Sequence, residues 1–178
     1  MSWHDGGLMD RVRLEPFTDH HLAHIAALLA DPEVLRFTRI PEPPPADFAR
    51  QWLDRYEAGR SDGTSEAFAA IDPDGRFLGL ALAPEIDREA AEIELGYILA
   101  PRARGRGYAT EMLRILTKWA FDEAGAKRIV LVINVENAPS ERVAERCGYT
   151  REGVARSVHL KQDIRTDAAI WSRLPSDP

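Results

Sequence analysis

The stretch Arg102-Ala103-Arg104-Gly105-Arg106-Gly107-Tyr108-Ala109-Thr110 lies between an apolar run that ends at Ala100 and an amphipathic run that follows Gly107. Gly105 and Gly107 have no Cβ, so the backbone turns tightly there and approaches a ligand closely. The first turn of the helix that follows offers free N–H groups and the positive end of the helix dipole, which favour an anion. Three arginines add charge and donors. The stretch therefore predicts a phosphate-binding loop.

What this loop lacks narrows the choice of phosphate ligand. No Gly-x-x-x-x-Gly-Lys-Ser/Thr is present, so the lysine and hydroxyl of a nucleotide-binding P-loop are missing. A dinucleotide fingerprint requires a small residue where Thr110 stands, and it belongs in the first strand–helix turn of a domain rather than past the middle of the chain. A solvated basic turn that caps a helix is the alternative without a ligand.

The pattern Arg-x-x-Gly-x-Gly between a strand and a long helix, together with other segments, resembles the GNAT superfamily of acyl-CoA-dependent N-acyltransferases. The segments that resemble its RimJ/RimL-type branch are Glu94–Ile98, Gly107–Glu111, Asn137–Ser140 and Cys147–Tyr149. That branch acetylates N-terminal amines of ribosomal proteins and includes enzymes that act on other amines. The resemblance covers residues 11–174 and is most specific over 92–153.

The resemblance implies an α/β (α+β) fold with a single, mixed, mostly antiparallel seven-stranded sheet flanked by about four helices. In this family the strands that correspond to 91–99 and 128–134 run parallel and splay apart at their ends, because a bulge in the former breaks the ladder. The opening receives the pantetheine arm of the coenzyme. The whole chain, 1–178, is expected to be one N-acetyltransferase domain.

Composition agrees with a single soluble domain, because 178 residues suffice to bury one sizeable core. The single cysteine, Cys147, suits a reducing compartment, no apolar run approaches the roughly 20 residues of a membrane helix, and Met1–Asp5 shows no signal-peptide pattern. We therefore expect a cytoplasmic protein without membrane contact, as a monomer or homodimer. A net charge of −6 argues against general nucleic-acid binding, which needs a basic face.

Periodicity and turn residues predict the elements. Apolar residues recur every three or four positions in the expected helices, and alternating or continuous apolar runs mark the expected strands. The expected helices are 20–29, one containing Phe48, Trp52 and Tyr56, 107–124 and 138–146, and the expected strands are 11–17, 67–71, 77–83, 91–99, 128–133, 149–158 and 165–173. By resemblance to the family, the proline-rich segment 30–46 is interpreted as a loop that shapes the acceptor site rather than as an interdomain linker.

By resemblance, the coenzyme is held largely by the backbone. Backbone groups of Tyr97, Ile98 and Leu99 are expected to pair with the pantetheine amides, and Asn137 to hydrogen-bond the same arm. An N-cap of the 138–146 helix is the alternative role for Asn137. The residues expected to bind the diphosphate are Arg102, Arg104, Gly105, Arg106, Gly107, Tyr108, Ala109 and Thr110.

Moving an acyl group from sulfur to an amine requires a neutral amine, a stabilised oxyanion and help for the departing thiolate. About one-tenth of an α-amine with a pKa near 7.7–8.0 is already unprotonated at neutral pH. Deprotonating a lysine side chain costs about 3.5 kcal/mol more. A weak base therefore suffices for an α-amine. Glu94 is the leading candidate, acting through water from the strand face opposite Tyr97. A paired carboxylate without a catalytic task is the alternative.

The proton donor to the thiolate is the point where the sequence departs from the superfamily, which often has a tyrosine where Ala144 stands. The RimL-like branch has a serine in Asn-x-x-Ser, which matches Ser140. Serine is a poor acid, so hydrogen bonding to the departing sulfur is its expected contribution, and plain capping is the alternative. Tyr149 is interpreted as core packing.

His159, in a late strand near the acceptor side, is a third catalytic candidate, because a neutral imidazole accepts a proton at cellular pH. A structural histidine is the alternative. His20 and His24 have helical chelating spacing, but no third ligand accompanies them, so no metal is predicted. Cys147 is interpreted as a small buried hydrophobe, since no activating base for an acyl-cysteine is evident.

Three functions follow from these residues. The first is transfer of acetyl from acetyl-CoA, bound as cosubstrate, to a peptide N-terminus by direct attack in a ternary complex. The second keeps that chemistry with a small amine such as a polyamine, an aminoglycoside or an amino-acid analogue. The third is a CoA-binding sensor without turnover. Segments 30–46 and 155–167 are expected to decide the acceptor.

Overall fold

The computed structural model describes residues 11–178. Met1–Asp5, where the leader was assessed, lies outside the described residues, as does the start of the predicted 1–178 domain. The helices are α1 (Leu22–Leu29), α2 (Pro32–Phe37), α3 (Phe48–Asp62), α4 (Tyr108–Asp122) and α5 (Ala138–Arg146), with 3₁₀ turns η1 (Asp19–His21) and η2 (Pro101–Ala103). The strands are β1 (Arg13–Pro16), β2 (Glu66–Ile71), β3 (Phe77–Asp87), β4 (Glu92–Leu99), β5 (Arg128–Asn134), β6 (Thr150–Lys161) and β7 (Ile164–Arg173).

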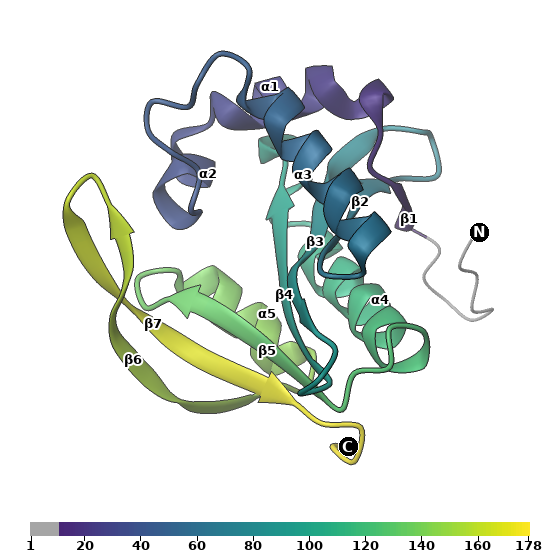
Figure 1. Cartoon of the computed structure of the whole chain (residues 1–178), viewed down its shortest axis with the longest axis vertical. Coiled ribbons are helices and arrows are strands. Elements are labelled where there is room, and N and C mark those ends of the chain that lie inside the picture. Colours follow the sequence, from purple (N-terminus) through teal and green to yellow (C-terminus); the bar gives the residue numbers. More distant parts are fainter. Residues whose placement is uncertain (1–10) are drawn as a thin grey trace.

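The strands form one seven-stranded sheet in the order β1-β2-β3-β4-β5-β7-β6 (Figure 1). Every neighbouring pair is antiparallel except β4 and β5, which run parallel. Their ladder runs from Glu92–Arg128 to Glu94–Val130 and ends there, although both strands continue. The predicted mixed sheet with two parted central parallel strands is confirmed.

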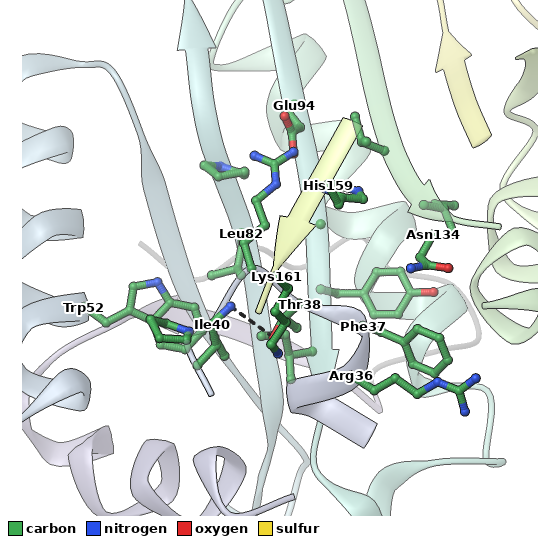
Figure 2. Close-up of a pocket in the computed structure, with 18 of the residues that line it drawn as sticks. Arg36, Phe37, Thr38, Ile40, Trp52, Leu82, Glu94, Asn134, His159 and Lys161 are labelled. Carbon is green, nitrogen blue, oxygen red and sulfur yellow. Dashed lines mark hydrogen bonds and ion pairs between the residues drawn. The ribbon is translucent and has the colours of Figure 1, made fainter. Parts of the chain in front are cut away.

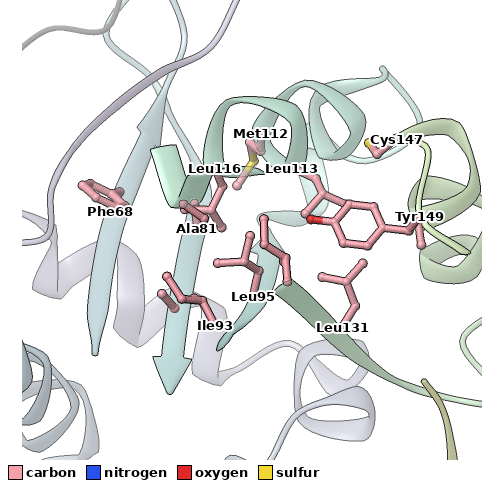
Figure 3. Packing of buried hydrophobic residues seen from close by; sticks show 14 of the residues in the cluster. Phe68, Ala81, Ile93, Leu95, Met112, Leu113, Leu116, Leu131, Cys147 and Tyr149 are labelled. Carbon is pink, nitrogen blue, oxygen red and sulfur yellow. The ribbon is translucent and has the colours of Figure 1, made fainter. Parts of the chain in front are cut away.

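Each face of the sheet carries its own hydrophobic core. On one face α4 packs Met112, Leu113 and Leu116, all fully buried, against Ile93 and Leu95 of β4 (Figure 3). On the other face α1, α2 and α3 cover a second cluster, to which β4 contributes Ile98. Because successive side chains of a strand point to opposite faces, β4 presents its odd-numbered residues to α4 and its even-numbered ones to α3.

The interpretation of 30–46 entirely as a loop is wrong, because α2 occupies Pro32–Phe37. The local signal was present in Asp31-Pro32: the Asp31 carboxylate accepts a hydrogen bond from the Glu33 N–H at 2.9 Å, and Pro32 occupies the first turn, where a missing N–H costs nothing. The proline-rich Pro41–Pro45 segment that follows remains without helix or strand.

The bulge beside the parted strands lies in β3 rather than in β4. Leu82 pairs with Gly96 and Glu85 pairs with Glu94, so three steps along β3 match two along β4. The extra residue falls at Ala83–Pro84, and a proline has no N–H to give to a ladder, so it is tolerated at such a position. The bulge therefore perturbs β4 from the β3 side.

Candidate active site

The predicted phosphate-binding loop has the backbone that its glycines imply. Gly105 and Gly107 have φ values of +71° and +84°, in the left-handed region that residues with a Cβ rarely adopt. The first hydrogen bond of α4 runs from the Glu111 N–H to the Gly107 carbonyl at 3.2 Å. The N–H groups of Tyr108, Ala109 and Thr110 precede that bond, in the turn where a helix leaves its donors for a ligand.

The arginines of the loop are held differently from expectation. Arg104 forms ion pairs with Asp31 at 2.6 Å and Glu33 at 3.2 Å, and Arg102 donates to the Phe77 carbonyl at 3.0 Å. Arg106 is exposed. Two of the three guanidinium groups therefore anchor the loop to the rest of the protein, and the backbone amides and the exposed Arg106 guanidinium remain as its anion donors.

A pocket of about 1140 Å³ opens where β4 leaves β5 (Figure 2). Its lining includes Leu95–Ile98 of β4 and Leu131–Asn134 of β5, the stretches beyond the end of the shared ladder. Since β4 pairs with β3 on its other side, the edge that faces β5 keeps backbone groups of Tyr97 and Leu99 unpaired within the sheet. The pocket thus joins the two faces of the sheet.

Glu94 is the last residue of β4 that pairs with β5, and it lies on the wall of this pocket. Its carboxylate is 3.2 Å from the guanidinium of Arg39, and 20% of its side chain is exposed. Burial raises the pKa of Glu94, the charge of Arg39 lowers it, and the nearby Glu85 raises it further, so that the pKa lies above the ordinary glutamate value. A carboxylate with a raised pKa is a stronger proton acceptor.

His159 of β6 lines the same pocket and is half-buried (Figure 2). Burial lowers its pKa, and the charge of Arg39 lowers it further, so the ring is neutral at neutral pH. Because Arg39 acts on both Glu94 and His159, the two predicted proton acceptors share one electrostatic environment.

Ser140 lies in the first turn of α5 and lines the pocket. Asn137 caps that helix: its side-chain oxygen accepts the Ser140 N–H at 3.3 Å. The capping role proposed as an alternative for Asn137 is therefore present, and it orients Ser140. The Tyr97 hydroxyl lies 3.0 Å from Ser140 Oγ, a contact that sequence reasoning missed.

Tyr149 and Cys147, which were interpreted as core residues, are buried, whereas His24 is exposed. Tyr149 is buried and its hydroxyl lies 2.6 Å from Thr117 Oγ1. Cys147 is buried, and burial raises the pKa of its thiol to about 11, so it is protonated at neutral pH. Ala144, at the position of the superfamily's tyrosine, is fully buried. His24 stacks on Phe77 with ring centroids 4.8 Å apart.

The segments expected to shape the acceptor site meet at the pocket. Lys161 of β6 donates to the Leu35 carbonyl and lies 3.4 Å from the Glu42 carboxylate. Gln162 donates to the Glu42 carbonyl at 2.9 Å. Figure 1 shows the same relation, with the tip of the β6–β7 hairpin curving toward α2. One wall of the pocket is therefore built from residues more than a hundred positions apart.

Charges around the pocket balance. Its lining carries four basic and four acidic side chains, and His159 is neutral. Three of the acidic groups have basic partners: Glu94 with Arg39, Glu136 with Arg36 at 3.0 Å, and Glu42 with Lys161. The two other charged residues of the lining are Arg55 and Asp62, both from α3.

Across residues 11–178, no three His, Cys, Asp or Glu side chains gather closely enough to hold a metal ion. In the same residues, no helix has the length and apolar character needed to cross a membrane.

With this geometry established, comparison with known proteins identifies the family. Residues 11–150 match the family model of the acetyltransferase (GNAT) domain. The chain belongs to the GNAT acetyltransferase family. This GNAT chain is therefore an N-acetyltransferase that uses acetyl-CoA, and the predicted resemblance is confirmed.

Individual relatives and solved structures resemble this GNAT chain to different extents. "Putative ribosomal N-acetyltransferase YdaF" of Bacillus subtilis is 31% identical over 101 residues, which span 57% of this chain and 55% of YdaF. The spermidine N-acetyltransferase of Vibrio cholerae, solved with CoA and spermine, has a TM-score of 0.83 at 21% identity and covers 94% of this chain and 97% of its own. A "putative ribosomal-protein-serine acetyltransferase" of the same organism has a TM-score of 0.77 at 20% identity and covers 94% and 96%.

The residues of this GNAT chain fit the coenzyme of the family. A Cβ built on Gly105 meets nothing within 4 Å, so the loop leaves open space beside its amides. The free strand edge at Tyr97–Leu99 offers main-chain groups to an amide-bearing arm, and the pocket lining includes Tyr97 and Ile98 of this edge together with Glu94. When bound, acetyl-CoA would supply the activated acyl group.

Proposed function

We propose that this protein transfers acetyl from acetyl-CoA to the α-amine of a protein or peptide. The observation that carries the proposal is the balanced charge of the acceptor pocket, in which Glu94, Glu136 and Glu42 each have a basic partner. A polyamine carries several ammonium groups and binds best to carboxylates without such partners. A peptide N-terminus brings a single amine followed by a neutral backbone.

Pocket size supports the same acceptor. A volume of about 1140 Å³ exceeds the roughly 300–1,000 Å³ of typical small-molecule pockets, which leaves room for peptide residues beside the acyl-bearing arm. Both walls of the pocket offer backbone as well as side chains, from the strand edges of β4 and β5. The similarity to YdaF, which is named as a putative ribosomal N-acetyltransferase, supports the same acceptor class.

Proton transfer is assigned to Glu94. The α-amine needs little deprotonation at neutral pH, so a carboxylate with a moderately raised pKa is an adequate base, directly or through one water. His159 is the second proton acceptor in the same pocket, and its neutral ring can pass a proton from Glu94 toward solvent. The unprotonated nitrogen attacks the thioester carbonyl in a ternary complex.

Departure of the thiolate is assigned to Ser140. Its hydroxyl lines the pocket at the start of α5, where the dipole of the helix favours negative charge. The carbonyl oxygen is expected to meet main-chain donors of the parted β4 edge, which act as an oxyanion hole. Coenzyme binding itself is assigned to the amides of residues 105–110 and to the Tyr97–Leu99 edge, since the Arg104 N–H donates to the Pro101 carbonyl.

The proposal is tested by incubating the protein with acetyl-CoA and a panel of acceptors: short peptides that differ at the first residue, an N-blocked lysine peptide, and spermidine. Intact-mass analysis with measurement of free-thiol release is expected to show acetylation of unblocked peptides only. If spermidine were acetylated in preference to the peptides, the proposed acceptor would be a polyamine instead of a peptide. CoA binding without thiol release from any acceptor would favour a sensor.

A further inference from the structure

The hydroxyl of Tyr97 is not used by the coenzyme role expected of this residue, which concerns its backbone. It reaches across the gap between β4 and α5 and lies 3.0 Å from Ser140 Oγ, 43 positions away in the chain. Both residues line the pocket at the parted strands. A side-chain pair thus joins the predicted pantetheine edge to the start of α5.

Relative acidity decides which hydroxyl donates. A phenol is a better donor than an aliphatic hydroxyl, so Tyr97 donates and Ser140 Oγ accepts. Within residues 11–178, Tyr97 supplies the one side-chain bond to Ser140 Oγ, and the Ser140 N–H is bonded to Asn137. The hydroxyl of Ser140 therefore keeps its own proton to donate to a third atom in the pocket.

We infer that Tyr97 is a positioning residue, whose phenol orients the Ser140 hydroxyl and strengthens it as a hydrogen-bond donor to the coenzyme sulfur. The inference rests on the role of Ser140 in the proposed function and does not depend on the acceptor. As the N–C bond forms and the C–S bond breaks, sulfur keeps the electron pair. The Ser140 hydroxyl stabilises that charge, and neither residue gives up its proton.

A donor role fits the surroundings of Tyr97 better than an acid role. Burial raises the pKa of Tyr97 to about 12, so proton transfer from it to a thiolate, whose thiol has a pKa near 8.5, is uphill. The other titratable group that acts on Tyr97 is the Cys147 thiol, which burial keeps protonated at neutral pH. Glu94 and His159 face the pocket from β4 and β6.

The test uses CoA with its free thiol, bound to the full chain. Ultraviolet difference spectra with and without CoA report the thiolate, and titration below the pKa of Cys147 gives the pKa of the bound thiol. Ser140→Ala is expected to raise that pKa by about one unit, since a hydrogen bond to a charged group contributes about 1.5–3 kcal/mol. Tyr97→Phe is expected to raise it by about half a unit.

Tyr149→Phe is the matched control, because its buried hydroxyl also has one hydroxyl partner, Thr117, but lies away from the pocket lining. It is expected to leave the thiol pKa unchanged. Because Tyr97 acts through Ser140, the double variant is expected to match Ser140→Ala alone. A second readout is the affinity of each variant for CoA, measured by calorimetry at pH values above and below the pKa of the CoA thiol.

Each outcome separates this inference from the proposed function. A shift with Ser140→Ala but none with Tyr97→Phe overturns the inference and leaves Ser140 in place. No shift with either variant removes both assignments. Should Tyr97→Phe not fold, fluorotyrosine at all four tyrosines serves instead: a more acidic phenol is a stronger donor, so the bound thiol pKa is expected to fall. An unchanged pKa there also overturns the inference.

Discussion

The coenzyme half and the acceptor half of the site are built in different ways. The coenzyme half comes from one continuous stretch, β4 through the start of α4, and offers mainly backbone: a free strand edge and the amides after Gly105 and Gly107. The acceptor half is assembled from side chains distant in sequence, such as the pair Arg39–Glu94 and the Lys161–Glu42 contact. Local backbone geometry therefore builds the binding site for the coenzyme, whereas packing between distant segments builds the binding site for the acceptor amine.

The largest expected effect separates catalysis from coenzyme binding. Glu94→Gln removes the proposed base and is expected to lower kcat about a hundredfold, within the usual contribution of general bases, while the Kd for CoA stays within twofold. Steady-state kinetics and calorimetry measure the two values. Glu92→Gln is the matched control, because Glu92 lies on the same strand, pairs with Arg128 at 2.6 Å and does not line the pocket. A kcat within threefold of wild type would assign the base to another group.

The second test addresses the coenzyme half. Gly105→Ala is expected to raise the Kd for CoA about tenfold, because a Cβ at φ +71° costs about 1–2 kcal/mol and displaces the loop amides. Gly75→Ala is the control: Gly75 has φ +79°, open space around it and a place in the β2–β3 turn. The midpoint temperature of thermal unfolding, Tm, is expected to fall by the same amount in both variants. Equal CoA affinity in both would remove the loop from the coenzyme site.

The acceptor half is tested by Lys161→Ala, which removes the contacts to the Leu35 carbonyl and Glu42. We expect the KM for a peptide acceptor to rise about two- to fivefold, since a partly exposed ion pair contributes about 0.2–1 kcal/mol, and the Kd for CoA to stay unchanged. Lys118→Ala, which breaks an exposed pair with Asp122 on α4, is the control. A change in CoA affinity instead of acceptor KM would contradict the division of the site.

The smallest expected effect is a shift in pH dependence. Arg39 lowers the pKa of both Glu94 and His159, so Arg39→Gln is expected to raise both. A base acts when deprotonated, and the rate falls as pH drops through its pKa. The acid limb of kcat/KM should therefore move to higher pH by about half a unit, whichever residue is the base. Arg36→Gln, paired with Glu136, should leave the limb in place; a shift toward lower pH in Arg39→Gln would refute the electrostatic account.

The same contrast explains what the sequence predicts well. The helix expected over 138–146 is observed as α5, because Asn137, Pro139 and the apolar spacing are local signals. The parted β4–β5 pair was expected from the resemblance to the GNAT superfamily, because these two strands are far apart in the chain and no local pattern shows that they pair. The short α2 was missed although Asp31-Pro32 is a helix-start signal, because the neighbouring prolines dominated the interpretation.

Contacts between distant segments were beyond sequence reasoning. No local pattern shows that Arg104 pairs with Asp31, 73 positions away, or that Arg39 reaches Glu94. The Tyr97–Ser140 contact depends on how α5 packs beside the parted strand. Each depends on tertiary packing, which periodicity and capping do not encode.

The central claim, that backbone amides hold the coenzyme, is tested most directly by amide NMR of the protein titrated with CoA. The account predicts the largest shifts at the amides of residues 105–110 and 97–99, with small shifts over segment 30–46. Shifts concentrated in 30–46 or on β1 and β2, with the loop amides unmoved, would contradict it.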